Sequence, residues 1–194
     1  MNKWSRRGFI GAGVLTGGAL VVGVAIRPGN AVDKLRGSVA GGEGEQLVNA
    51  WVKIDRDSTV TAIVPHCEMG QGAHTTLAQM LADELDADWA KVSVMQAPAD
   101  GNYVVPDAAR DFVAAWSLDA PKWLEPTYNG LFTQISKLGD VLVTGGSSSV
   151  RTTGQHTMRL AGAAARQMLV AAAAARWNVP ASEIVAENST LVHK

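Results

Sequence analysis

The chain has 194 residues, which is enough for one domain of ordinary size. Its composition, 47% hydrophobic and 18% charged with a net charge of −1, is typical of a globular protein and excludes a wholly disordered chain. Four of the 17 basic residues and none of the 18 acidic ones lie within residues 1–31. The rest of the chain is therefore acidic, and nucleic acid is not an expected partner.

The first 31 residues have the arrangement of an export signal. Residues 5–10 read Ser-Arg-Arg-Gly-Phe-Ile, which resembles the twin-arginine motif, and an uncharged run diluted by glycines continues to Ile26. This route carries folded proteins, so a cofactor assembled in the cytoplasm can travel inside the fold. A retained membrane anchor is the alternative, because a helix over residues 9–26 spans about 27 Å, close to the thickness of a hydrocarbon core. Either outcome predicts a periplasmic protein or one anchored in the membrane and facing the periplasm.

After this signal, a predicted linker is followed from about residue 47 by the pattern of a folded domain. Residues 32–46 are predicted to be a linker because glycines interrupt polar residues there. The domain proper is predicted over 47–194 and opens with a hairpin, in which apolar and polar residues alternate over 51–55 and 59–64. An amphipathic helix is predicted over 75–85, and a further strand contains Val92 and Val94.

The second half of the chain is less regular at its start. Residues 98–140 are predicted to be irregular apart from a short helix at 108–116, and a strand is predicted over 141–144. The longest helix is predicted over 157–177. Its packing face is predicted to contain Leu160, Ala164, Met168, Ala172 and Ala175. A hairpin of 184–186 with 191–193 completes an α+β domain of two similar halves, with two main helices packed on a mixed or antiparallel sheet.

Two glycine-rich segments each follow a predicted strand and precede a predicted helix. The first is Gly70-Gln71-Gly72, and the second runs from Gly145 to Ser149. The N–H groups at a helix N-terminus bind anions, and glycines let the backbone approach a phosphate closely. Neither segment matches a common nucleotide loop: no lysine follows Gly72, and Thr75 stands where the dinucleotide fingerprint has its third glycine. Taken alone, each segment is more typical of a tight turn than of a ligand site.

The residues around these glycines carry a resemblance to a known family. Residues 68–75 read Glu-Met-Gly-Gln-Gly-Ala-His-Thr and resemble the EMGQGxHT segment of molybdenum hydroxylase large subunits. That family includes xanthine dehydrogenases, aldehyde oxidoreductases and the isoquinoline 1-oxidoreductase type. Residues 144–151, which read Thr-Gly-Gly-Ser-Ser-Ser-Val-Arg, and residues 177–182 resemble further segments of the last group. The resemblance covers nearly the whole chain and is weakest over 104–130.

The resemblance implies that the two segments hold a molybdopterin cofactor with molybdenum, expected in its cytosine dinucleotide form. The amide of Gln71 would hydrogen-bond the cofactor, and hydroxyl and N–H groups of the second segment would bind the pterin or its phosphates. Arg151 would pair with a phosphate or with a neighbouring acid. The implied cofactor-binding residues are Gly70, Gln71, Gly72, Gly146, Ser147, Ser148, Ser149 and Arg151.

The resemblance also implies an oxidoreductase that hydroxylates aldehydes or N-heterocycles with oxygen derived from water. Cys67 is the only cysteine, so a [2Fe–2S] cluster would belong to a partner small subunit, and a cytochrome c subunit is a further candidate partner. Family members continue for several hundred residues and carry their catalytic glutamate near the far C-terminus. We therefore expect an N-terminal part that needs the remainder of the large subunit and is inactive alone. The alternative is a non-catalytic exported α+β module whose glycine loops hold another anion or nothing.

The polar residues beside the first segment include candidates for a metal site and for a catalytic base. Adjacent strand residues point to opposite faces, so His66 and Cys67 are not expected to bind copper or zinc together with His74. Glu68 is interpreted as structural. No catalytic residue and no metal ligand is assigned.

Overall fold

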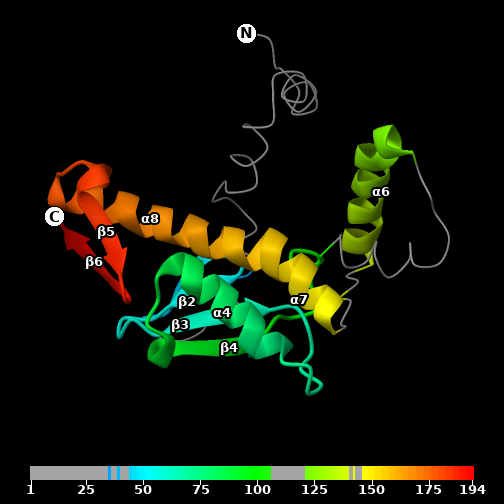
Figure 1. The fold of residues 1–194 in the computed structure, drawn as a ribbon, viewed down its shortest axis with the longest axis horizontal. Helices are drawn as coiled ribbons and strands as arrows, with labels where there is room; N and C mark the ends of the chain where they lie inside the picture. Colours follow the sequence, from blue (N-terminus) through cyan, green and yellow to red (C-terminus); the bar gives the residue numbers. More distant parts are fainter. Residues whose placement is uncertain (1–34, 36–38, 40–43, 106–120, 140–141, 143–145) are drawn as a thin grey trace, which may run out of the picture.

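A four-stranded mixed sheet forms the base of the domain in a computed structural model that describes residues 35, 39, 44–105, 121–139, 142 and 146–194 (Figure 1). Its strands are, in spatial order, β1 (Gln46–Asn49), β2 (Val52–Ile54), β3 (Val60–Val64) and β4 (Val92–Gln96). β1, β2 and β3 pair antiparallel, whereas β3 and β4 pair parallel. The predicted hairpin and the predicted strand around Val92 are confirmed, and β1 is an additional strand.

Two main helices, α4 (Ala73–Leu85) and α8 (Arg159–Trp177), lie over this sheet (Figure 1). α8 continues without a break from α7 (Ser147–Thr153) through one π-helical turn, Gly154–Met158. A separate antiparallel pair, β5 (Ile184–Glu187) and β6 (Thr190–His193), follows α8. Further elements are α6 (Glu125–Leu138) and the short 3-10 helices Trp89–Lys91, Lys122–Leu124 and Ala181–Glu183. The α+β fold class with a mixed sheet and two main packed helices is thus confirmed.

The order β3–α4–β4 determines where a ligand could bind. β3 and β4 are parallel and are joined through α4, so their carboxyl ends lie at the same edge of the sheet. Ligands of sheets with parallel strands commonly bind outside the carboxyl ends of those strands. The segment containing Gly70-Gln71-Gly72 leaves β3 at this edge and leads into α4.

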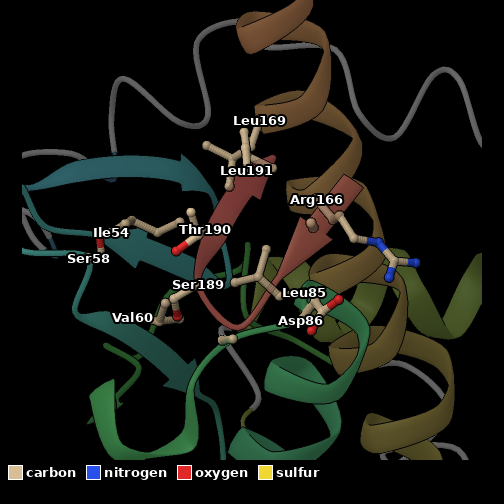
Figure 2. A pocket seen from close by; sticks show the side chains of 12 residues that line it. Ile54, Ser58, Val60, Leu85, Asp86, Arg166, Leu169, Ser189, Thr190 and Leu191 are labelled. Carbon is tan, nitrogen blue, oxygen red and sulfur yellow. The ribbon is translucent and has the colours of Figure 1, made fainter. Parts of the chain in front are cut away.

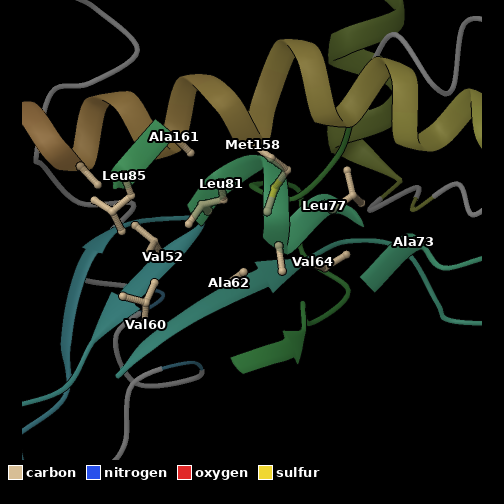
Figure 3. Close-up of a cluster of buried hydrophobic side chains, with 12 residues drawn as sticks. Val52, Val60, Ala62, Val64, Ala73, Leu77, Leu81, Leu85, Met158 and Ala161 are labelled. Carbon is tan, nitrogen blue, oxygen red and sulfur yellow. The ribbon is translucent and has the colours of Figure 1, made fainter. Parts of the chain in front are cut away.

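The main hydrophobic core lies between the sheet and the two helices (Figure 3). Leu77, Leu81 and Leu85 recur at helical spacing on α4 and are buried, as predicted. They pack with alternate residues of β3, since every second side chain of a strand points to the same face. Met158 and Ala161 complete this core from the π-helical turn and α8.

α8 packs on α4 through its smallest residues. A methyl group at Gly162 would overlap the backbone carbonyl oxygen of Leu81, and one at Gly154 would overlap the sulfur of Met80. Helices approach this closely only where side chains are minimal. The predicted packing face of α8 is therefore wrong: Leu160 is 48% exposed, whereas Ala161, Gly162 and Ala165 are buried. Small and apolar residues recur at helical spacing on two faces of α8. The face with the smaller residues packs on α4 because the two helices approach each other closely.

A second hydrophobic cluster lies on the opposite face of the sheet. It contains Leu35, Val39, Ile63 and Tyr103, and the ring of Tyr103 meets Trp51 edge-to-face at 5.2 Å. Because both faces are covered, every residue of β3 is buried. Within the segment predicted to be a linker, 32–46, Leu35 and Val39 are helical and buried, and Gln46 is the first residue of β1.

Three further sequence predictions differ from the structure. Residues 125–138, predicted to be irregular, form α6, with a proline in its first turn. The serines after Gly146 begin a helix rather than lying in a loop. Among the described residues the two halves of the domain differ, because those of the second half contribute a two-stranded sheet. The helix predicted at 108–116, the export segment 1–31 and most of the strand predicted at 141–144 lie outside the described residues.

Candidate functional site

The first glycine-rich segment forms a tight loop between β3 and α4. Gly70 has φ 89° and Gly72 has φ 76°, which is the left-handed region that side chains other than glycine rarely adopt. A methyl group would meet no neighbour within 4 Å at Gly70, so close packing is not the reason for this glycine. The shape of the backbone therefore requires both glycines, whether or not a ligand is bound.

The carboxylate of Glu68 lies inside this loop and accepts three backbone hydrogen bonds. Its Oε1 accepts from the N–H of Gly70 at 2.8 Å and of Gly72 at 3.0 Å, and its Oε2 accepts from the N–H of His74 at 3.0 Å. The N–H donors of His74 and Gly72 lower the pKa of this carboxyl below its ordinary value, because they stabilise the charged form. An anion of the chain itself thus occupies N–H groups at the start of α4. The structural interpretation of Glu68 agrees with these contacts.

The side-chain amide of Gln71 is hydrogen-bonded to the same loop. Its Nε2 donates to the carbonyl oxygen of Cys67 at 2.8 Å, and its Oε1 accepts from the N–H of Met69 at 2.5 Å. The two contacts define which end of the amide is nitrogen, since a carbonyl oxygen needs a donor and an N–H needs an acceptor. Gln71 is half-buried, so its orientation is set by the chain while part of it is exposed to solvent.

A polar network joins this loop to the rest of the carboxyl edge. The Nε2 atom of His74 lies 2.7 Å from the carbonyl oxygen of His66 and 3.2 Å from Oε1 of Gln96, the last residue of β4. Both neighbours are acceptors, so the Nε2 of His74 carries the proton. The Nε2 of His66 in turn lies 2.7 Å from the hydroxyl of Thr153, and this contact is buried. No local pattern in the sequence indicates this last pair, which joins positions 87 residues apart.

The described part of the second glycine-rich segment, residues 146–149, forms the start of α7. Gly146 is the residue before the first turn, and Ser147 and Arg151 are exposed. Ser148 and Ser149 lie in the first turn of the same helix. Arg151 makes no ion pair or hydrogen bond with any residue that the structure describes. A cation with no partner among the described residues is suited to binding an anion at this place.

The fold brings the two glycine-rich segments to the same end of the domain. α7 contacts α4 (Figure 1). The hydrogen bond between His66 and Thr153 joins the segment that precedes the first loop to the last residue of α7. The predicted site residues thus divide into a neutral polar group, centred on Gln71, and a group on α7 that ends in a cation. That they line one common surface remains a prediction.

The candidate metal ligands His66 and Cys67 differ in their exposure to solvent. His66 is buried and bonded to Thr153, whereas its neighbour Cys67 is exposed. The two side chains therefore point apart, as expected from alternation along an extended segment. Within the described part of the chain, no three histidine, cysteine, aspartate or glutamate side chains are grouped so that they could hold a metal ion.

A separate pocket of about 200 Å³ lies beside the middle of α8 and the β5–β6 hairpin (Figure 2). Figure 2 shows Leu169, Leu191 and Val60 around it, and the guanidinium of Arg166 extends away from them. The pocket is lined by Ile54, Ser58, Val60, Leu85, Asp86, Ala87, Arg166, Leu169, Ala186, Ser189, Thr190 and Leu191. None of these residues belongs to the glycine-rich segments. The pocket therefore lies outside the candidate site.

Comparisons with known proteins match the chain to a family model and to two relatives. Residues 15–107 match the family model of the molybdopterin cofactor-binding domain. The chain is 32% identical over 193 residues to the isoquinoline 1-oxidoreductase subunit beta of Brevundimonas diminuta, covering 99% of this chain and 20% of that protein. It is 34% identical over 172 residues to a membrane-bound aldehyde dehydrogenase [pyrroloquinoline-quinone] of Gluconacetobacter polyoxogenes, covering 86% of this chain and 16% of that protein. The chain thus spans about a fifth or less of the length of these relatives.

Among the described residues, no helix has the length and apolar character needed to cross a bilayer.

Proposed function

Because the chain belongs to the molybdenum hydroxylase family and carries its molybdopterin cofactor-binding domain, we propose that it supplies part of the cofactor site of an enzyme that oxidises aldehydes or N-heterocycles. The observation that carries this proposal is the loop around Gln71 at the carboxyl edge of β3 and β4, which lies within the matched residues. The oxygen inserted into the substrate would come from water. When bound, molybdopterin with molybdenum would supply the redox chemistry.

Different residues of the candidate site suit different parts of such a cofactor. Glu68 already occupies N–H groups at the start of α4, so a phosphate there would lie beside a second negative charge. Gln71 presents a neutral amide, which suits the uncharged pterin. Arg151 and Ser147 are exposed on α7, and Arg151 has no partner among the described residues, which suits a phosphate. We therefore propose that Gly70, Gln71 and Gly72 hold the pterin, and that Gly146, Ser147, Ser148, Ser149 and Arg151 hold the phosphates of a cytosine dinucleotide form.

The experiment measures bound cofactor in the chain co-produced with the rest of its large subunit. We expect molybdenum and a fluorescent oxidised pterin to co-purify with the protein, in equal amounts. Gln71→Ala and Arg151→Ala are expected to lower both. Gln167→Ala and Arg176→Ala, at exposed positions on α8, are the matched controls and are expected to leave both unchanged.

Two outcomes contradict the proposal in different ways. If pyrroloquinoline quinone co-purified in place of pterin, the cofactor would be the one given in the name of the Gluconacetobacter relative, and the molybdopterin proposal would be wrong. Neither cofactor in the wild-type protein would favour the non-catalytic anion- or ligand-binding module.

The partners and the location follow from the same reading of the family. We propose that the remainder of a large subunit and an iron–sulfur small subunit assemble with the chain, since its one cysteine cannot hold a [2Fe–2S] cluster. A cytochrome c subunit is a further proposed partner. We also propose that residues 1–31 direct export by the twin-arginine route to the periplasm, with or without retention as an anchor. The family match begins at residue 15, inside this segment, and so does not test its boundary.

A further inference from the structure

Glu68 is placed so that its contacts fall on both sides of Gln71. The N–H groups of Gly70 and Gly72 both donate to the same oxygen of Glu68, and the N–H of His74 donates to the other. The amide of Gln71 then closes onto Cys67 and Met69, the residues on either side of Glu68. Five hydrogen bonds thus tie residues 67–74 into one closed arrangement.

We propose that Glu68 is a positioning residue, which holds the Gly70–Gly72 loop and the side-chain amide of Gln71 in one orientation before any ligand arrives. The role for a ligand rests on the proposed function, whereas the role in orienting Gln71 does not. Glu68 itself makes no proposed contact with the cofactor.

The physical reason is the freedom of the two glycines. A glycine has more accessible backbone conformations than any other residue, so a loop with glycines on both sides of Gln71 would sample many orientations if nothing held it. The carboxylate removes this freedom by binding the N–H of each glycine. If the amide is already oriented, ligand binding does not have to supply the free energy for ordering the loop, so affinity is not reduced by that cost.

The carboxylate does this only in its ionised form, because a protonated acid accepts fewer hydrogen bonds and brings a donor towards N–H groups. Its pKa is lowered from the ordinary value of 4.5, chiefly by the N–H groups of His74 and Gly72, and His74 is also the titratable side chain that acts on it through its charge. A lowered folded-state pKa means that the contribution is complete above 4.5 and is lost as the pH falls through the folded-state value. The loop should therefore be ordered at neutral pH and loosen in acid.

Simple helix capping is the competing explanation. If Glu68 only stabilises the start of α4, its removal should loosen the N–H of His74 and leave the amide of Gln71 where it is. If Glu68 positions Gln71, the side-chain amide hydrogens of Gln71 should lose their protection as well. The two explanations thus differ in the protection that they predict for the side-chain amide hydrogens of Gln71.

The experiment is nuclear magnetic resonance on the full chain, which reports hydrogen exchange at Gly70, Gly72 and His74 and at the side-chain amide of Gln71. The variants are Glu68→Ala, which removes all three acceptor contacts, and Glu68→Gln, which retains one oxygen should the first variant fail to fold. We expect protection of all four groups, Gln71 included, to fall by about tenfold or more in Glu68→Ala. Glu187→Gln, at an exposed position of the β5–β6 hairpin, is the matched control and should leave them unchanged.

The pH series and the cofactor content complete the test. Wild-type protection, corrected for intrinsic exchange, should fall below pH 4.5 and follow the titration of Glu68. Unchanged protection of Gln71 in both Glu68 variants would overturn the proposal in favour of helix capping. If the wild-type protein binds no pterin, the proposed function fails, and the exchange data still decide the role of Glu68.

Discussion

The imidazole of His66 and the hydroxyl of Thr153 form a buried hydrogen bond of 2.7 Å between positions 87 residues apart. It joins the segment after β3 to the end of α7, and so links the two glycine-rich segments through the interior of the domain. Removing the hydroxyl withdraws a buried hydrogen-bonding partner from His66 while almost preserving the shape of the side chain. Thr153→Val is therefore expected to lower the free energy of unfolding by about 1–3 kcal/mol.

Urea unfolding checks this prediction. Thr127→Val, the same exchange at an exposed position of α6, is the control and should change stability by less than about 0.5 kcal/mol. Equal effects of the two substitutions would mean that the buried contact contributes nothing measurable.

The crossing of α8 over α4 depends on Gly162. A methyl group there would overlap the backbone oxygen of Leu81, which cannot move without shifting α4. Gly162→Ala is therefore expected to lower the free energy of unfolding by about 1–3 kcal/mol, although alanine is the better helix former. Gly130→Ala in α6 is the matched control, because no atom lies within 4 Å of the added methyl group. It should stabilise the protein by about 0.5–1 kcal/mol, and thermal unfolding that ranks the two variants the other way would refute the close crossing.

Tyr103 is fully buried, and its hydroxyl has no hydrogen-bond partner among the described residues. Burial raises the pKa of this phenol above its ordinary value of 10. The unfolded chain therefore loses this proton before the folded chain does, so the contribution of Tyr103 to stability should decrease as the pH rises above 10. In Tyr103→Phe this alkaline loss of stability should be smaller, which unfolding at a series of pH values measures.

The same substitution has a second expected effect at neutral pH. Phenylalanine keeps the edge-to-face contact with Trp51 and removes a buried polar group, so the free energy of unfolding should rise by about 1 kcal/mol. A loss of stability would show instead that the hydroxyl has a partner.

Export depends on the arginine pair if residues 1–31 are a twin-arginine signal. Changing both Arg6 and Arg7 to lysine keeps the charge and should leave a fused reporter in the cytoplasm. Arg27→Lys, outside the motif, is the control and should be exported normally. Fractionation that finds the double variant in the periplasm would exclude this route.

Much of the domain follows from local patterns in the sequence. The spacing of Leu77, Leu81 and Leu85 determines α4 and its buried face, and alternation determines the hairpin of β2 and β3. These patterns are local because a helix face and a strand face repeat within a few residues. The family resemblance was likewise carried by short runs of residues around Gly70-Gln71-Gly72 and Gly146.

Contacts between distant residues decided the rest, since no local period encodes them. α8 has apolar residues on more than one face, and only the close approach of α4 at Gly162 selects the face that packs. The parallel pairing of β3 and β4 places the loop at a carboxyl edge, and the hydrogen bond between His66 and Thr153 brings α7 to that edge. The sequence shows a glycine loop before a helix, which suggests a place for an anion. Only the folded loop shows that Glu68 already occupies it, because three N–H groups converge there once both glycines adopt positive φ.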